Sequence, residues 1–315
     1  TAAPAAAGLW DTSHETPEAW SPETFRGLDA ARPPDSTGEP DESLPPGAGA
    51  PAAPSGPLSI WQDERVAEVY RRTVDGCRWA GVRGPHTFKI LESAGCASPP
   101  LHVCGDPGLL LQAPAMPGPV EPWLKEWIDD KSPFVAVNWG TANNNVFGGN
   151  EGAVAEALAR AIESLVRGGY RVLFFAVWGP DLSPVRRLAA AFRGDPGVAV
   201  LGRVPPGPQL AWILRHARFS INFKLHANVF SAAVDCPFIS LAYRSKCCDF
   251  AASMACDDLV VRFDRPDLAE AVLRTAHLVE RNHKGIKERL RYHRRRYTQR
   301  LEALVKHMAA LSEGG

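Results

Sequence analysis

The feature of this sequence that most limits its fold is a series of short apolar runs separated by helical segments, beginning at Phe134. The runs are FVAVNWG (134–140), YRVLFFAVW (170–178), VAVL (198–201), FSINF (219–223) and FISL (238–241). Several of them are apolar at successive positions, which is typical of strands buried on both faces. Strands of this kind that alternate with helices predict a parallel sheet covered by helices on both sides.

Helices are predicted between these strands, at 150–166, 184–192, 209–216 and 227–234. Gly168-Gly169 ends the first of them and Cys236-Pro237 ends the last. The final segment, 268–311, is predicted to be almost entirely helical, with a break at Gly285. We therefore predict a carboxyl-terminal Rossmann-like domain over 132–275, followed by a basic helix over 276–315.

Before this domain, ordered structure is predicted only from Ile60. A helix at 63–74, a strand at 79–82, a helix at 86–94 and a strand at 101–104 form the remainder of an amino-terminal Rossmann-like domain, 58–115. Residues 30–57 contain eight prolines and four glycines. Such a segment buries too little surface to offset the entropy of ordering it, so 1–57 is predicted to be largely irregular. A second proline cluster predicts a linker at 116–131.

Composition argues against several classes of protein. The formal net charge is zero and the pI about 7.1, which argues against a dedicated nucleic-acid-binding protein. The seven cysteines form no CxxC pair, so we expect reduced thiols in a cytoplasmic protein rather than a disulfide scaffold or a zinc site. No apolar run reaches 18 residues, so no transmembrane helix is predicted. No cluster of residues has metal-ligand spacing, and no metal is predicted.

The basic residues are concentrated near the end of the chain. Residues 281–300 contain nine Lys and Arg against the single acid Glu288. This pattern predicts a solvated face or a helix that packs back on the first domain. Contact with anionic lipid or acidic glycan through Arg289, Arg291, Arg294, Arg295 and Arg296 is the alternative, and it would place the protein at the inner face of the membrane.

Polar residues follow two of the predicted strands directly. Lys224 and His226 come after the strand at 219–223, where the next helix begins, and Arg244 and Lys246 follow the strand at 238–241. Parallel strands end at the same edge of a sheet, where α/β enzymes place their reactive groups. A histidine at this edge can exchange protons near neutral pH. The alternative is structural: a helix-start histidine bonded to backbone, and cations on the surface.

A turn rich in Asn and Gly, GTANNNVFGG (140–149), joins the first strand of the second domain to its helix. It matches neither GxGxxG nor GxxxxGK[ST]. Backbone N–H groups at the start of a helix can nevertheless bind an anion, and Asn143 and Asn145 are candidate neutral donors beside them. A polar turn without a ligand is the alternative.

Three segments together resemble a known family. They are GVRGPHTFKIL (81–91), GDPGLLL (105–111) and the unit at 221–246, in which a strand, Lys224-Leu225-His226, a helix and CPFISLAYRSK follow one another. Their order and spacing are similar to those of the polysaccharide pyruvyl transferases. The resemblance implies two Rossmann-like domains with parallel sheets that face each other across a cleft, as in B-type glycosyltransferases.

The same resemblance implies an activity and its partners. Family members transfer the enolpyruvyl group of phosphoenolpyruvate onto sugar hydroxyls of a bacterial polysaccharide or a lipid-linked precursor, which gives a pyruvate ketal. Phosphoenolpyruvate is then the donor substrate, no cofactor is expected, and a glycan or lipid-linked saccharide is the acceptor. Nucleic acid is not an expected partner, while a homo-oligomer and peripheral membrane association remain open.

Site residues follow from the resemblance position by position. His226 corresponds to the histidine of the family's Arg-Leu-His pattern and is the candidate catalytic acid and base. Lys224 stands where that pattern has arginine, which keeps the charge but loses the planar fork that grips a carboxylate. The candidate donor-binding residues are Lys224, Leu225, Arg83, Arg244, Lys246, Asn143 and Asn145.

The chain also departs from the family at its beginning. Members usually start with a strand and a Gly-Asn-x-Gly-Asp turn before Arg-Gly-Pro, and neither is found before residue 60; the chain starts at Thr1. We therefore expect an incomplete amino-terminal domain, in a fragment or in a diverged member that binds without turnover. A nucleotide-sugar glycosyltransferase of the same fold and a non-catalytic binding protein are the alternatives.

Overall fold

The computed structural model describes residues 64–77, 79–96, 101–115, 122–130 and 132–313. These residues divide into two compact units, one formed by Asp106–Leu301 and the other by the described residues up to Gly105 together with those from Glu302. The segment predicted to be irregular, 1–57, lies outside the described residues.

The described part of the first unit is a small β-α-β arrangement preceded by a helix. Its elements are α2 (Glu64–Asp75), β1 (Ala80–Val82), α3 (Pro85–Ser93) and β2 (Leu101–Val103). The two strands pair in parallel, with Gly81 opposite His102. Buried Ala67, Val74 and Leu91 form a core between the helices and the strands. The four elements predicted here are confirmed.

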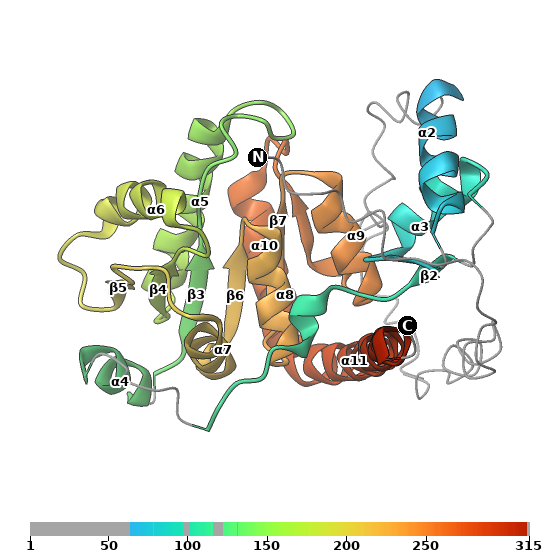
Figure 1. Ribbon diagram of the computed structural model, residues 1–315. Coiled ribbons are helices and arrows are strands. Elements are labelled where there is room, and N and C mark those ends of the chain that lie inside the picture. Colours follow the sequence, from blue (N-terminus) through green and yellow to red (C-terminus); the bar gives the residue numbers. More distant parts are fainter. Residues whose placement is uncertain (1–63, 78, 97–100, 116–121, 131, 314–315) are drawn as a thin grey trace, which may run out of the picture. The chain divides into compact units, whose positions relative to one another are not determined.

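The second unit is built on a six-stranded sheet in which every pair of neighbours is parallel. Its spatial order is β5-β4-β3-β6-β7-β8 (Figure 1). The strands are β3 (Phe134–Asn138), β4 (Arg171–Phe175), β5 (Val198–Val200), β6 (Phe219–Asn222), β7 (Phe238–Ala242) and β8 (Val260–Arg262). All residues of β3, β4, β6 and β7 are buried, as their continuous apolar runs predict.

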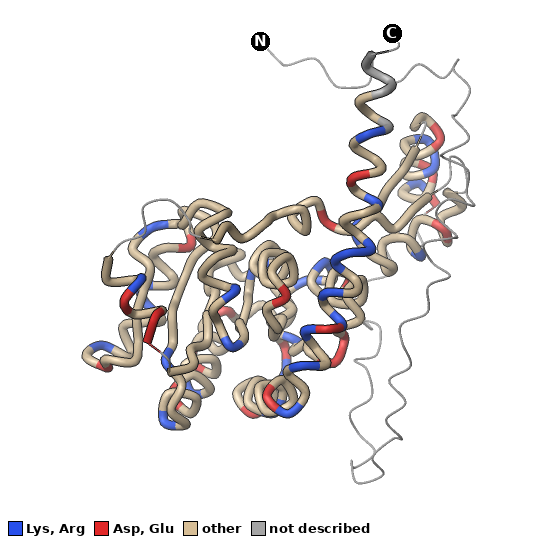
Figure 2. The backbone as a smooth tube through the Cα atoms, turned by 90° about the horizontal axis from the view of Figure 1, so that it is seen from below, with Lys and Arg blue, Asp and Glu red and all other residues tan. Residues whose placement is uncertain are grey.

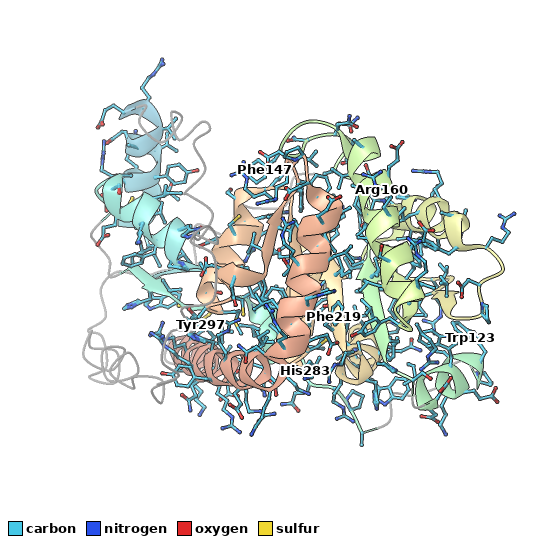
Figure 3. All side chains as sticks on the ribbon, turned by 180° about the vertical axis from the view of Figure 1, so that it is seen from behind. Trp123, Phe147, Arg160, Phe219, His283 and Tyr297 are labelled. Carbon is cyan, nitrogen blue, oxygen red and sulfur yellow. The ribbon has the colours of Figure 1, made fainter. Side chains whose placement is uncertain are left out.

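Helices cover both faces of this sheet. They are α5 (Glu151–Arg167), α6 (Leu182–Ala189), α7 (Gly207–His216), α8 (Leu225–Ala233), α9 (Ser245–Ser253) and α10 (Leu268–Arg281). On one face α10 packs against α5, which Figure 3 shows from behind. On the other face α7 packs against α8 (Figure 1). The predicted α/β class with parallel sheets is confirmed.

The order of the strands reverses between β3 and β6. From β3 the chain builds β4 and β5 on one side, and it then returns to build β6, β7 and β8 on the other. The loops that leave β3 and β6 therefore diverge, and this is the place where open α/β sheets bind ligands. Asn138, the last residue of β3, bonds to both sides: its Nδ2 donates to the carbonyl of Phe175 (3.1 Å), and its Oδ1 accepts the N–H of Lys224 (2.9 Å).

Two α-helices and one strand of the described residues were not predicted. Helix α9 and strand β8 are new, and α4 (Pro122–Asp129) lies within the predicted linker 116–131. Leu124 and Ile128 of α4 are buried in the core cluster that contains Phe134 and Trp212, so this segment packs as part of the second unit. The boundary between the units, at Gly105 and Asp106, precedes residue 115, the predicted end of the first domain.

The break in the last helical segment lies at Asn282, not at Gly285 as predicted. Gly285 is inside α11 (His283–Glu313). A Cβ atom at Gly285 would lie 2.3 Å from Oδ1 of Asn282, so the glycine permits the close approach of this side chain and does not end the helix. None of the helices in the described part of the chain has the length and apolar character needed to cross a bilayer.

Helix α11 carries the predicted concentration of basic residues, seen as blue positions along its length in Figure 2. Three of its arginines contact carboxylates of the second unit. Arg289 donates to Asp258 (2.9 Å), while Arg294 (2.9 Å) and Arg291 (3.2 Å) both donate to Asp235. These charge-assisted hydrogen bonds hold the first half of α11 on its own unit.

Candidate functional site

Lys224 lies at the point where β3 and β6 diverge. It follows β6 and is the residue before the first turn of α8. Its ammonium donates to the carbonyl of Thr141 (2.5 Å) and lies 3.3 Å from Oδ1 of Asp181. The side chain of Lys224 is 15% exposed and that of Asp181 is fully buried. The side chain of Lys224 thus contacts the loops that follow β3 and β4.

Asp181 is the acidic partner that the sequence analysis did not identify. It ends the short 3-10 helix η5 (Gly179–Asp181) after β4, and its Oδ1 also accepts the N–H of Thr141 (3.0 Å). Its other oxygen, Oδ2, is buried and has no hydrogen-bond partner among the described residues. Burial raises the pKa of Asp181, against the opposing effects of the Thr141 N–H and of Lys224.

Gly140 makes this ion pair possible by its lack of a side chain. A Cβ atom at this position would lie 2.4 Å from Oδ1 of Asp181 and 2.8 Å from Cε of Lys224. Both distances are shorter than any ordinary contact, so a larger residue would have to displace the pair. The requirement follows from tertiary packing and not from backbone conformation.

We expect Gly140→Ala to lower the free energy of unfolding by about 1–3 kcal/mol, the usual effect of overpacking a filled site. Urea denaturation measures this change. The matched control is Gly202→Ala in the same unit, where an added Cβ meets no atom within 4 Å. Equal stability of the two variants would show that the ion pair is not confined by Gly140.

The Asn/Gly turn after β3 is closed by the carboxylate of Glu151. Oε1 of Glu151 accepts the N–H groups of Ala142 (2.6 Å) and Asn144 (3.1 Å), and its Oε2 accepts the hydroxyl of Thr141 (2.7 Å). At the start of α5, Oδ1 of Asn150 accepts the N–H of Ala153 (3.0 Å). The N–H groups of Ala142, Asn144 and Ala153 are therefore bonded within the chain. The turn is thus held by hydrogen bonds to Glu151, at the start of the helix that follows it.

The side chains of Asn143 and Asn145 are exposed to solvent, whereas that of Lys224 is mostly buried. Asn143 adopts a left-handed conformation (φ 54°), which asparagine tolerates well, and both Asn143 and Asn145 are exposed. The carbonyl of Asn145 accepts Nε of Arg244 (3.0 Å), and the N–H of Phe147 donates to the carbonyl of Tyr243 (3.0 Å). The turn is thus fixed to the end of β7, and Arg244 takes part in fixing it.

Helices α8 and α9 begin at this edge of the sheet, and in neither does the side chain of the cap residue accept a hydrogen bond from the helix. Lys224 occupies the cap position of α8 and Arg244 that of α9. Lys246 lies in the first turn of α9, with its ammonium 5.2 Å from the ring centroid of Tyr243. The first N–H groups of a helix have no partner inside it, and the helix dipole places partial positive charge there. Two such ends, each preceded by a cation, form an electropositive edge.

His226 lies in the first turn of α8 and is exposed. Its ring stacks on that of Phe230, with 6.2 Å between the centroids. Leu225, between His226 and Lys224, is only 3% exposed, so its contribution to a ligand site would be its backbone N–H. The three residues of the Lys-Leu-His segment thus have different surroundings: an ion pair, the core and solvent.

Arg83 belongs to the first compact unit, where it separates β1 from the start of α3. Its side chain is half-buried. Its predicted role in donor binding stays a prediction, as do those of the seven candidates in the second unit.

A pocket of about 360 Å³ lies between α5 and α6. Most of its lining is apolar, from Trp139, Ala155, Ala159, Pro184, Leu188 and Ala191. Gly140 and Thr141 also line it, whereas none of the predicted site residues does. Thr141 therefore contacts both features: it lines the pocket, and its backbone bonds to Lys224 and Asp181. Among the described residues, no three His, Cys, Asp or Glu side chains gather as a metal-binding group.

Known structures resemble this fold at low sequence identity. The GtfA/B complex is matched with a TM-score of 0.52 and 10% identity, over 79% of this chain and 48% of that one. A UDP co-structure of S. aureus MnaA is matched with a TM-score of 0.48 and 12% identity, over 66% and 53%. E. coli ADP-heptose LPS heptosyltransferase II is matched with a TM-score of 0.40 and 13% identity, over 72% and 82%. The first of these similarities shows a shared fold.

The chain spans about half the length of the first structures that it matches, 53%, 51% and 48% of them. No curated protein sequence matches it. The family model for polysaccharide pyruvyl transferase matches residues 44–245, which is more than half of the chain and includes β1 to β7. The chain therefore belongs to the polysaccharide pyruvyl transferase family.

Proposed function

We propose that this protein transfers the pyruvyl group of phosphoenolpyruvate onto two hydroxyls of one sugar, in a bacterial polysaccharide or its lipid-linked precursor. Family membership supplies the reaction class. The observation that carries the proposal is the electropositive edge, where α8 and α9 begin without side-chain caps behind Lys224 and Arg244.

The donor has two anionic groups, a carboxylate and a phosphate, and both need fixed cations and N–H donors. The start of α8 with Lys224 would hold one group, and the start of α9 with Arg244 and Lys246 the other. Because β6 and β7 are adjacent and parallel, these two helix starts lie at the same edge of the sheet. Lysine binds such a group as a point charge, without the bidentate geometry of arginine.

The reaction needs one proton donor and one base. The methylene carbon of the donor gains a proton, the first sugar hydroxyl adds to the neighbouring carbon, and the second hydroxyl replaces phosphate there. Of the two hydroxyl protons, one balances the new methyl group and the other leaves with phosphate. His226 is our candidate for both transfers, since its side chain is exposed at the start of α8 and histidine commonly serves as a general acid and base.

The acceptor sugar would lie against Trp178. This indole follows β4 and is 58% exposed, although it is a large apolar side chain. Its ring centroid lies 5.5 Å from the ammonium of Lys224, which places it beside the proposed donor site. An exposed aromatic face offers a sugar ring a large apolar contact at a fixed position.

We expect Trp178→Ala to raise the KM for the acceptor roughly tenfold, which corresponds to about 1.4 kcal/mol of lost binding. The unfolding midpoint should change little, because the side chain is mostly exposed. Steady-state kinetics in both substrates measures the difference. Trp123→Ala is the matched control, since Trp123 is 41% exposed on α4. A tenfold effect in the control as well would remove Trp178 from the acceptor site.

The proposed function is tested by incubating the chain with phosphoenolpyruvate and a bacterial glycan that carries free hydroxyl pairs. Release of inorganic phosphate together with an acid-labile pyruvate ketal on the glycan supports it. A parallel reaction with UDP-sugars tests the glycosyltransferase alternative. Release of UDP with growth of the glycan, and no phosphate from phosphoenolpyruvate, would replace the proposal by that alternative.

A further inference from the structure

Only one of the two carboxylate oxygens of Asp181 has polar partners among the described residues. Its Oδ1 receives the Thr141 N–H (3.0 Å) and faces the ammonium of Lys224 (3.3 Å), whereas Oδ2 is buried and has no hydrogen-bond partner among the described residues. A fully buried polar atom without a partner is costly, and native proteins retain few of them. The residue is also the only counter-charge that the described structure places on Lys224.

We propose that Asp181 is a proton-accepting counter-ion of Lys224, so that binding of an anionic donor to Lys224 is coupled to protonation of the Asp181 carboxylate at Oδ2. The inference rests on the proposed function, because it assigns the donor to Lys224. Asp181 is a positioning residue in this scheme: it acts on the donor through the lysine and does not touch it.

The coupling follows from charge. In the unliganded protein one ammonium faces one buried carboxylate. When a donor anion approaches Lys224, two anions share a single cation in a poorly solvated place, and neither can move away cheaply. Protonation of the carboxylate removes the repulsion and leaves the charge of Lys224 to the donor. The lost ion pair is replaced by the contact between Lys224 and the new anion.

The geometry specifies where the proton goes. Oδ1 already accepts the Thr141 N–H, so protonation there would disrupt an existing bond. Oδ2 has no bond to lose. A proton on Oδ2 therefore keeps the Thr141 loop in place while the charge changes.

The neighbouring ionisable groups favour the same outcome. Lys224, before α8, stabilises the charged carboxylate, whereas Glu151 on α5 acts against it, and Tyr243, after β7, also interacts with it electrostatically. Burial is the largest of the effects and already raises the pKa of Asp181. An anion on Lys224 weakens the lysine's opposing effect and raises that pKa further. Proton uptake is expected in the pH range between the pKa of Asp181 in the free protein and its higher pKa in the anion complex.

The inference is tested by calorimetric titration of the full chain with sulfate and with phosphoenolpyruvate, in two buffers of different ionisation enthalpy. Sulfate does not titrate near neutral pH, so any proton uptake on its binding belongs to the protein. His226→Gln removes the imidazole as a source of uptake. Lys224→Met identifies which binding depends on the lysine. Asp181→Asn keeps the size of the side chain and an acceptor for the Thr141 N–H.

We expect proton uptake with both anions in the natural chain and in His226→Gln, and none in Asp181→Asn. The asparagine variant should bind the anions about tenfold more tightly at the upper end of the pH range, because the competing carboxylate is gone; a factor of ten equals one pKa unit. Lys224-dependent binding without proton uptake would overturn the inference alone. So would uptake that persists in Asp181→Asn. If neither anion shows Lys224-dependent binding, the donor site of the proposed function fails together with the inference.

The natural chain and His226→Gln decide the matter even if Asp181→Asn does not fold. In these two proteins the affinity for sulfate should fall as the pH rises through the range of proton uptake. An affinity that is independent of pH across that range would overturn the coupling.

Discussion

Replacement of Lys224 by methionine is expected to abolish donor binding and to lower the free energy of unfolding by about 3–5 kcal/mol near neutral pH, the usual loss when one member of a buried ion pair is removed. The substitution leaves the carboxylate of Asp181 buried and unpaired, because Lys224 is its charged partner at 3.3 Å. Methionine keeps most of the volume of the lysine side chain. The loss is therefore attributed to charge and not to a cavity.

The loss of stability in Lys224→Met should depend on pH with a definite sign. Burial raises the pKa of Asp181 above its ordinary value of 3.8, and loss of the ammonium raises it further. A group whose pKa is higher in the folded state contributes most to stability below its unfolded pKa, and this contribution is lost as the pH rises through the folded pKa. The difference in free energy of unfolding between Lys224→Met and the natural chain should therefore shrink as the pH falls toward 3.8.

Urea denaturation at a series of pH values measures this difference. Lys125→Met is the matched control, because Lys125 is exposed on α4 and the change should have little effect at any pH. A loss of stability in Lys224→Met that is the same at every pH would contradict the assignment of Asp181 as the unpaired charge.

The second large effect is expected for His226→Gln, in which transfer activity should fall by about 10²- to 10⁴-fold, the usual contribution of general acid–base catalysis. Stability should not change, because the imidazole is exposed and packs on the ring of Phe230 on the same helix. Affinity for phosphoenolpyruvate should be nearly retained. Loss of activity at unchanged affinity and stability is the combination that a structural histidine would not give.

Phosphate release under saturating donor, together with a thermal-shift titration, distinguishes these quantities. His277→Gln is the matched control, since His277 is an exposed histidine on α10. If His226→Gln keeps full activity, the acid–base role belongs to another group. If it loses affinity for the donor instead, the imidazole binds rather than transfers protons.

The sheet of the second unit could be predicted because its central strands are apolar on both faces. Strand β8 was missed because it is only three residues long and lies at the edge of the sheet, where burial leaves a weaker pattern. Helix α9 was missed although its buried residues Cys247, Phe250 and Ala251 have helical spacing, because the helix is only nine residues long and small and polar residues surround them.

The site was predictable in part for the same reason. A lysine directly after a buried strand must lie at the sheet edge, so the position of Lys224 followed from the strand. Its pairing with Asp181 did not, because the two residues become neighbours only when β4 and β6 lie on either side of β3. Glu151 could have been considered from the sequence, since a carboxylate at the start of a helix is favoured by the dipole there. Asn138 was a further signal, as a lone amide in an apolar strand.

The two uncapped helix starts have a consequence for how the protein would behave during turnover. One product of the proposed reaction is inorganic phosphate, and the positive edge that attracts the donor would attract it equally. We expect progress curves to flatten before the donor is consumed, and phosphate buffers to compete with it from the outset. In a living cell, flux through the enzyme would then follow the ratio of phosphoenolpyruvate to phosphate, and so respond to the energy state of metabolism rather than to donor supply alone.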